Sequence, residues 1–215
     1  MDRHRGRAGP AVSQGTGRAN KRDAVLRESA RLFAERGVEA TTMRVIADAC
    51  GMQAASLYHH FASKDELVAA ILVRSDAHIT GLYDAIRDAS LEPVDRLEAM
   101  IRATLDNLGH YRDAARIYYR DRAHVAASPL LTQVRDHAVA HDELWDRTID
   151  AAITAGRISP RFAATGLRRL LQELMWSTAR LRGDAVSADD IVHVLLRGVL
   201  APEPGRGEPA RRPES

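Results

Sequence analysis

Apolar residues recur along the chain at helical spacing, with small polar residues, glycines and prolines between the runs. Near the N-terminus, Leu26, Ala30 and Phe33 follow one another at intervals of three or four residues, which places them on one face of an α-helix. Asn20 is placed to cap the start of this helix and Gly37 to end it. The pattern therefore predicts a first helix between Asn20 and Gly37.

Three further apolar runs follow. Thr42 is a good N-cap for a second helix, and Gly51 supplies a turn after it. The apolar stripe of this second helix consists of Met43, Ile46, Ala47 and Cys50. A third helix is predicted over about 53–61, and Ser63 caps a fourth helix whose acidic first turn suits the helix dipole. Four such helices predict one compact unit.

Beyond about residue 80, prolines and glycines divide the apolar runs. Helix starts are expected where a proline takes the first helical position, at Pro93, Ser128-Pro129 and Ser159-Pro160. Helix ends are expected at Gly109, Gly156 and Gly183. Ser187 opens a last helix that is apolar around most of its circumference. One surface of that helix packs inside, and another needs a partner.

The composition agrees with an all-helical protein. Of the 215 residues, 45% are hydrophobic and only 5% are aromatic, and Ala, Leu and Arg are frequent. This length accommodates a module of about 50 residues and a body of ~130. The single cysteine, Cys50, excludes an internal disulfide, and no apolar run approaches the ~18 residues of a membrane span. With no signal sequence at its start, the protein is expected to be soluble and cytoplasmic.

Charge is distributed unevenly along the chain. The formal net charge of +2 is too small to indicate nucleic-acid binding. Residues 1–22 carry six basic side chains against Asp2 alone, which is typical of a disordered arm attracted to DNA. Acidic residues outnumber basic ones over 23–67, so DNA binding there must depend on the placement of side chains. The tail from Pro202 is rich in proline, glycine and arginine and is expected to be disordered.

The segment from Thr41 to Leu67, TTMRVIADACGMQAASLYHHFASKDEL, has the parts of a helix-turn-helix. This motif needs a short support helix, a tight turn with glycine, and a second helix whose first residues enter the major groove. Residues 43–50, Gly51 and 53–61 supply these parts in that order. Periodicity alone favours a generic helical hairpin equally.

The motifs of this segment resemble the TetR family of bacterial regulators. The resemblance rests on the threonine-capped helix, the A-x-x-x-G turn and the stretches LYHHF and SKDEL, and it runs without a gap from about Ala24 to Ile71. It implies an all-α homodimer with a homeodomain-like DNA-binding domain and a helical ligand-binding and dimerisation domain. With the composition, it predicts a disordered basic arm (1–19), a helix-turn-helix domain (20–67), a helical domain (68–201) and a disordered tail (202–215).

The resemblance also implies which side chains face DNA. Those expected at base edges are Gln53, Ala54, Ala55 and Ser56, and those expected at phosphates are Thr42, Tyr58, His59 and Lys64. Hydroxyl groups and helix N-termini donate to phosphate oxygens, and Lys64 adds a point charge. Gln53 can pair with adenine. The family often has a small hydroxyl residue there, so base reading is expected to differ. Leu57 and Phe61 are expected in the core.

No metal site and no catalytic site is expected. His59 with His60, and His137 with His141, are neighbours in the sequence, but a zinc site requires three or four converging ligands. Cys50 lies on the apolar stripe of the second helix and is interpreted as a packing thiol rather than a redox sensor. No phosphate-binding loop or nucleophile motif stands out, so the chain is expected neither to be an enzyme nor to hold a cofactor.

The larger helical part combines arginines with aromatic residues. They are Tyr111, Arg112, Arg116, Tyr118, Tyr119, Arg120, Trp145, Trp176 and Arg180. This mixture suits a large anionic amphiphile, and the alternative is surface arginines with aromatics in the core. The LYHHFASKDEL stretch and the W-x-x-x-R helix are similar to TetR-family repressors of actinobacterial sterol and fatty-acid catabolism, several of which respond to acyl-CoA thioesters. The predicted ligand residues are Gln172, Trp176 and Arg180, with the dimer interface as their alternative place.

Three classes of function compete: a ligand-responsive regulator, an architectural DNA-binding protein without a ligand, and a helical enzyme or carrier. The large apolar part of the chain favours the first class. The expected function is a repressor that binds a palindromic operator as a homodimer and leaves it when an effector binds, in the narrower prediction an acyl-CoA thioester. The resemblance places the dimer interface in the last two long helices, about 160–182 and 188–200.

Overall fold

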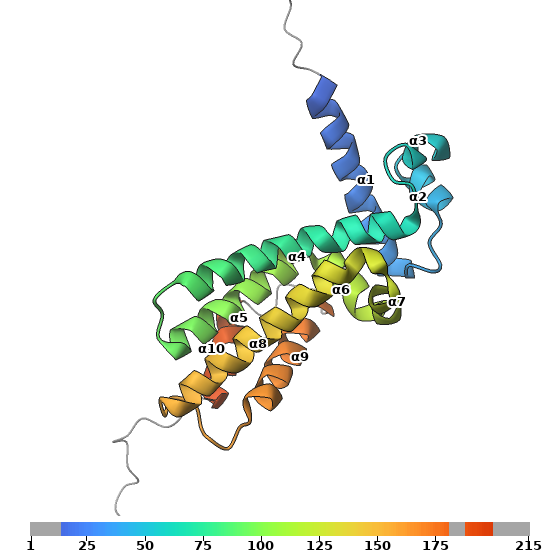
Figure 1. Cartoon of the computed structure of the whole chain (residues 1–215). Helices are drawn as coiled ribbons and strands as arrows, with labels where there is room; N and C mark the ends of the chain where they lie inside the picture. Colours follow the sequence, from blue (N-terminus) through green and yellow to red (C-terminus); the bar gives the residue numbers. More distant parts are fainter. Residues whose placement is uncertain (1–13, 181–187, 200–215) are drawn as a thin grey trace, which may run out of the picture. The chain divides into compact units, whose positions relative to one another are not determined.

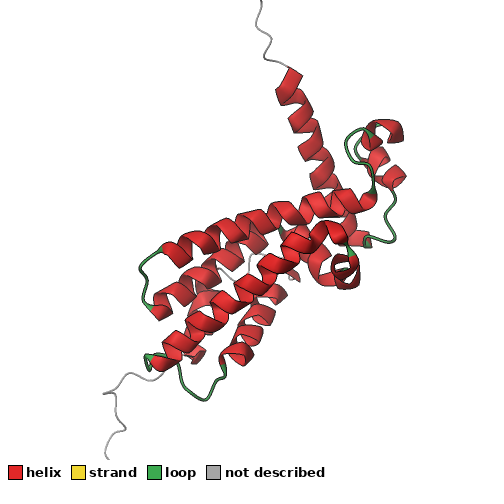
Figure 2. Ribbon diagram, viewed as in Figure 1, coloured by secondary structure: helices red, strands yellow, loops and turns green. Residues whose placement is uncertain are grey.

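The computed structural model describes residues 14–180 and 188–199, and every regular element in these ranges is helical (Figure 1). The α-helices are α1 Gln14–Arg36, α2 Met43–Ala49, α3 Ala54–Tyr58, α4 Lys64–Asp88, α5 Pro93–His110, α6 Arg112–Arg120, α7 Arg122–Ala127, α8 Thr132–Thr154, α9 Ala164–Arg180 and α10 Ala188–Val199. A short 3-10 helix, η1, covers Pro129–Leu131. Figure 2 shows helices joined by short loops, which confirms the predicted all-α class.

These helices form two compact units, neither of which is continuous in the sequence. The first unit, called the head, comprises the described residues up to Ser75 together with 113–132. The second unit, called the body, comprises 76–112 and the described residues from Gln133 onward. Helix α4 therefore contributes its first half to the head and its second half to the body.

Apolar side chains of α1 to α4 build the core of the head. α1 packs against α2, and α2 packs against α3. The largest buried side chains include Phe33, Ile46, Leu57, Phe61 and Leu67, each at most 1% exposed. Burying a side chain of this size contributes about 1.5–3 kcal/mol. This burial holds α3, which is too short to be a stable helix alone. The predicted places of Leu57 and Phe61 in the core are confirmed.

Two predicted caps start helices in the head. The hydroxyl oxygen of Thr42 accepts a hydrogen bond from the Val45 N–H at 3.3 Å, ahead of α2. The Ser63 hydroxyl oxygen accepts one from the Glu66 N–H at 3.1 Å, ahead of α4. The Glu66 carboxylate in return accepts the Ala62 N–H at 2.6 Å. These bonds satisfy backbone donors that lack a partner inside the helix, and such a cap contributes about 1 kcal/mol.

Two glycines end helices in the head as the sequence predicts. Gly37 follows α1 with a φ angle of 91°, and Gly51 follows α2 with a φ angle of 63°. A side chain at either position would strain this left-handed backbone. The glycines therefore fix where the chain leaves α1 and where it turns from α2 towards α3.

The body is assembled around α5, which packs against α9 and α10. Its inner face carries the fully buried Met100. α4 and α8 meet through a buried hydrogen bond in which the Trp145 indole N–H donates to the Tyr83 hydroxyl at 2.8 Å. The Thr104 hydroxyl donates its only hydrogen to the Met100 carbonyl oxygen. It therefore accepts the hydrogen bond that it shares with the Tyr83 hydroxyl, which is the donor, at 2.7 Å. Burial raises the pKa of Tyr83 to about 12, which keeps this donor protonated.

Three helix starts differ from the sequence prediction. α1 begins at Gln14, so Asn20 lies inside the helix and does not cap it; no proline between the two positions interrupts the helix. Pro160 lies in a turn, and α9 begins only at Ala164. Pro129 opens the three-residue 3-10 helix η1 instead of an α-helix. The fixed φ of proline suits a tight turn as well as a first helical turn, which explains both proline errors.

Several predictions fall outside the described residues. They are residues 1–13 of the predicted arm (1–19), the helix end at Gly183, the helix start at Ser187 and the tail 202–215. Residues 14–19 of that arm belong to α1 and are helical instead of disordered. The domain boundaries at 67 and 201 stay predictions. None of the helices in residues 14–180 and 188–199 has the length and apolar content that crossing a lipid bilayer requires.

Replacing Leu57 by alanine should lower the free energy of unfolding by about 2–5 kcal/mol, because it leaves a cavity beneath α3. Val73 is 41% exposed on α4, so Val73→Ala should change that free energy by no more than about 0.5 kcal/mol. Urea unfolding followed by circular dichroism measures both variants. Equal effects of the two substitutions would contradict the core described for the head.

Candidate nucleic-acid interface

The N-terminal end of α3 presents the side chains predicted to read bases. Gln53 precedes the helix with φ −71° and ψ 143°, and its side chain makes no capping hydrogen bond. Gln53, Ala54 and Ala55 are exposed, whereas Ser56 is half-buried. The helix ends at Tyr58, earlier than predicted. The exposed end of α3 therefore carries the amide of Gln53 and the methyl groups of Ala54 and Ala55. Both kinds of group can contact base edges.

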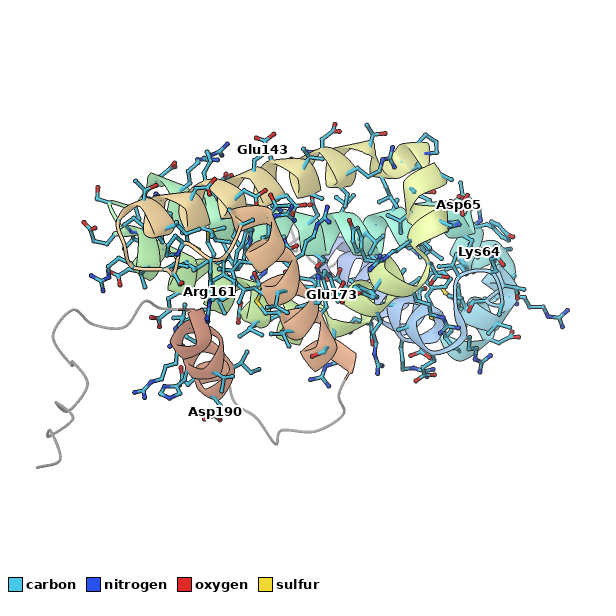
Figure 3. The ribbon with its side chains drawn as sticks, turned by 90° about the horizontal axis from the view of Figure 1, so that it is seen from below. Lys64, Asp65, Glu143, Arg161, Glu173 and Asp190 are labelled. Atoms are coloured by element: carbon cyan, nitrogen blue, oxygen red, sulfur yellow. The ribbon has the colours of Figure 1, made fainter. Side chains whose placement is uncertain are left out.

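The side chains predicted to bind phosphates lie before, at the end of and after α3. Thr42 is exposed at the start of α2, and both Tyr58 and His59 are exposed at the end of α3. Lys64 is the first residue of α4 (Figure 3). Its ammonium group lies 3.5 Å from the Glu39 carbonyl oxygen, a weak hydrogen bond that leaves the group able to turn towards an anion. All four residues belong to the head.

Arg44 is a further basic side chain near this surface, and it was not predicted from the sequence. It is exposed on α2, two residues after the Thr42 cap. Its neighbours Met43 and Ile46 on the same helix are buried, so the helical spacing turns Arg44 away from the core. The helical spacing of apolar residues in α2 could therefore have identified Arg44 as exposed from the sequence alone.

The three acidic side chains of α1 are all paired with arginines. Arg31 forms ion pairs with Glu28 at 2.5 Å and with Glu35 at 2.7 Å. Hydrogen bonding from Arg31 lowers the pKa of Glu28. Arg74 pairs with Asp23 at 3.1 Å. Such surface pairs contribute little to stability, because solvent and salt screen them. Each acidic side chain of α1 therefore has a cation beside it.

The titratable side chains singled out in the sequence have local structural explanations. His137 forms an ion pair with Asp76 at 2.7 Å, and His141 lies 3.2 Å from the Thr80 hydroxyl. Burial lowers the pKa of His141, so this ring is neutral at pH 7. Burial raises the pKa of the Cys50 thiol, which keeps it protonated and supports a packing role. Within residues 14–180 and 188–199, no three such side chains converge as metal ligands.

In the body, a polar network around Arg168 joins α8 to α9. Arg168 is 7% exposed and forms ion pairs of 2.8 Å with both Asp142 and Asp146. The Gln172 amide donates to Asp142 at 3.0 Å and accepts from Arg168 at 3.2 Å. The guanidinium group is buried whereas both carboxylates remain partly exposed, so each pair keeps the arginine charge satisfied inside the body. The network therefore fixes how α9 lies on α8.

Two of the three predicted ligand residues lie one turn apart on α9. Gln172 and Trp176 are both half-buried, and the Gln172 amide is already engaged by the Arg168 network. Arg180 is the last residue of α9, and its side chain lies outside the described part of the chain. Arg168 was not predicted from the sequence, because only its partners on another helix distinguish it from a surface arginine.

Known proteins match the chain in both of its parts. Residues 25–71 match the family model described as bacterial regulatory proteins, tetR family, and residues 90–180 match a tetracyclin repressor-like C-terminal domain. The HTH-type transcriptional repressor KstR2 of Mycobacterium tuberculosis is 31% identical over 161 residues, which cover 75% of this chain and 80% of the repressor.

Solved structures agree with this match. The ketosteroid transcriptional regulator KstR2 of Mycobacterium tuberculosis superposes with a TM-score of 0.79 at 26% identity, covering 91% of this chain and 99% of that one. AibR in complex with isovaleryl coenzyme A and operator DNA shares the fold, with a TM-score of 0.71 at 22% identity over 82% of this chain and 96% of AibR. The predicted helix-turn-helix and helical ligand-binding domains are confirmed. The chain therefore belongs to the TetR family of bacterial regulatory proteins, and it is a DNA-binding transcription regulator rather than an enzyme.

Proposed function

We propose that the protein is a repressor that binds a palindromic operator as a homodimer and leaves it when a small molecule binds the body. One observation carries the DNA-binding part: α3 exposes its N-terminal end while Leu57 and Phe61 anchor it in the core. An anchored helix with an exposed end is what a recognition helix needs to reach base edges. Similarity to the KstR2 repressor supports repression. Since bacterial operators lie on the chromosome, the protein works in the cytoplasm.

Base reading falls to Gln53, Ala54, Ala55 and Ser56. No capping hydrogen bond competes for the Gln53 amide, so its oxygen and its NH₂ group can both pair with one adenine. The methyl groups of Ala54 and Ala55 suit contact with thymine methyl groups. The half-buried Ser56 contributes its hydroxyl group. Together they favour A·T pairs at the centre of each half-site.

Phosphate binding falls to Thr42, Tyr58, His59 and Lys64, joined by Arg44. Hydroxyl and ring N–H groups orient the head on the backbone without reading sequence, and the two cations supply attraction. The acids of α1 are paired with arginines, so this attraction acts in spite of the acidic surplus over residues 23–67.

The dimer forms through α9 and α10, which lie within the predicted spans 160–182 and 188–200. Leu170 and Leu174, one turn apart on α9, are 52% and 44% exposed, and Val194 on α10 is 69% exposed. Exposed apolar side chains on two helices favour an interaction surface, and a two-fold axis brings the surface against its own copy. One recognition helix per chain then requires a palindromic site.

The effector is an acyl-CoA thioester, held by Gln172, Trp176 and Arg180. AibR, whose fold this chain shares, is known with isovaleryl coenzyme A bound, and KstR2 is described as a ketosteroid regulator. A CoA thioester carries phosphates and an apolar acyl group, so it requires both cationic and aromatic contacts. The half-buried Trp176 supports the apolar part of this site.

Removing the Lys64 charge with Lys64→Ala should weaken binding to all DNA sequences alike and flatten the salt dependence by about one unit, because a phosphate contact releases a counterion. Arg161→Ala is the matched control, since it removes the same charge from an exposed residue of the body (Figure 3). Fluorescence anisotropy at several salt concentrations measures the slope. A slope equal to that of Arg161→Ala would count against the phosphate role.

Charges placed in the dimer surface should produce monomers. Leu170→Glu combined with Leu174→Glu sets two carboxylates against their copies, so it should abolish dimerisation at micromolar concentration and operator binding with it. Val139, 61% exposed on α8, provides the control Val139→Glu, which should remain dimeric. Sedimentation velocity measures both variants. A dimeric double variant would place the interface elsewhere.

The effector proposal is tested by mobility shift on DNA upstream of the protein's own gene, with CoA, acetyl-CoA and cholyl-CoA. Release by cholyl-CoA is expected, and linkage makes DNA and ligand weaken each other by the same factor, typically ~5 to 150-fold. Trp176→Leu should blunt release while leaving affinity without ligand nearly unchanged. Loss of DNA binding by this variant would assign Trp176 to the dimer interface. Release by none of the thioesters would reject the ligand class and leave the regulator proposal intact.

A further inference from the structure

The DNA-binding head includes a segment that lies far from the helix-turn-helix in the sequence. Residues 113–132, with most of α6 and all of α7, belong to the same compact unit as α1 to α3. We propose that Arg120 and Asp121, where α6 meets α7, are positioning residues for operator recognition. They hold the C-terminal end of α1, and through it the start of α2. The inference rests on the DNA-binding role proposed for α3.

Arg120 caps α1 from outside that helix. Its guanidinium Nη1 donates to the carbonyl oxygens of Ala34 at 3.3 Å and Glu35 at 3.1 Å. The last carbonyls of a helix have no N–H partner within it and form the negative end of its dipole. A cation that donates to two of these carbonyls supplies their missing hydrogen bonds and also offsets the negative end of the dipole. Arg120 therefore ties the end of α1 to the junction of α6 and α7 through two hydrogen bonds.

Gly37 leaves the space that Arg120 occupies. A Cβ atom at this position would lie 3.0 Å from the Arg120 Nη2 atom. The φ angle of 91° at Gly37 also requires glycine. The residue that ends α1 thus serves two purposes, the turn of the backbone and the approach of the guanidinium.

Asp121 takes the backbone N–H that would have continued α1. Its Oδ1 atom accepts the Val38 N–H at 3.4 Å, and this N–H would otherwise have bonded to the Ala34 carbonyl in the next helical turn. Its Oδ2 atom is buried and has no hydrogen-bond partner among the described residues. A carboxylate oxygen that is buried without a partner is unfavourable for stability alone, which points to a positional role for this half-buried residue. Arg120 and Asp121 together are called the α1 clamp.

A continuous set of contacts leads from the α1 clamp to the operator-binding residues. The hydroxyl group of the fully buried Thr41 donates to the Gly37 carbonyl oxygen at 2.8 Å. The next residue, Thr42, caps α2 and is a proposed phosphate ligand. Because α3 packs against α2, the clamp sets where Thr42 and the exposed end of α3 stand in the head.

Direct contact between Arg120 and DNA is the rival explanation, since the residue is exposed. The two roles differ in salt dependence. A phosphate contact contributes to the salt slope, whereas a positioning contact changes affinity at every salt concentration equally. Arg122, the next arginine along the chain, is exposed and stacks on Tyr119 rather than on α1. It offers a matched control with the same charge.

The test uses the full-length protein and the DNA upstream of its own gene, with anisotropy measured at several salt concentrations. Arg120→Ala should weaken binding about tenfold, because two charge-assisted hydrogen bonds are lost, with an unchanged salt slope. Arg120→Lys keeps one donor and should recover to within about threefold of the native protein. Asp121→Asn keeps the acceptor and should bind within about twofold of the native protein, and Arg122→Ala should bind normally.

Hydrogen exchange without DNA supplies a second readout. Arg120→Ala should speed exchange at the Val38 amide and leave the amides of α5 unchanged, because only the end of α1 is released. Native affinity in Arg120→Ala, a flattened slope, unchanged exchange at Val38, or faster exchange throughout the protein would each overturn the proposal. Failure of the native protein to bind this DNA would count against the operator proposal alone, since exchange tests the clamp independently.

Discussion

Everything that the head does depends on the burial of Leu57 and Phe61 beneath α3. A five-residue helix has too few internal hydrogen bonds to exist in water alone, so its place and direction come entirely from its anchoring side chains. The same side chains therefore determine both the stability of the head and the direction in which Gln53 points. Ala54, Ala55 and Ser56, which follow Gln53, have small side chains, so they add nothing to the anchorage and leave the surface at this end open.

Local backbone chemistry made much of the head predictable. Thr42, Ser63 and Gly51 act within a few residues of their own position, and each does what its residue type suggests. Asn20 and Pro160 show the limit of this logic. A capping residue does not prevent a helix from starting earlier, and a proline suits a turn as well as a helix start. The side chains of the exposed surface were identified, but their contacts with DNA stay predictions.

The residues that the sequence could not identify are those whose partners lie on distant parts of the chain. Arg168 resembles any surface arginine until Asp142 and Asp146 are seen on the facing helix. Arg120 looked like part of a ligand-binding mixture, yet its donors reach the end of α1. In both cases the charged side chain contacts a partner on another helix. Spacing along a single helix gives no sign of that partner, so only the folded structure reveals the pairing.

The division of the head between two stretches of chain limits how it can be exchanged between proteins. A crossover within α4 would transfer residues up to Ser75 but leave 113–132 behind. The incoming α1 would then meet foreign side chains at the bonds that Arg120 and Asp121 make here. The head is therefore not one continuous segment that could be exchanged as a whole. A new DNA specificity is more readily gained by substitution at the exposed end of α3 than by recombination.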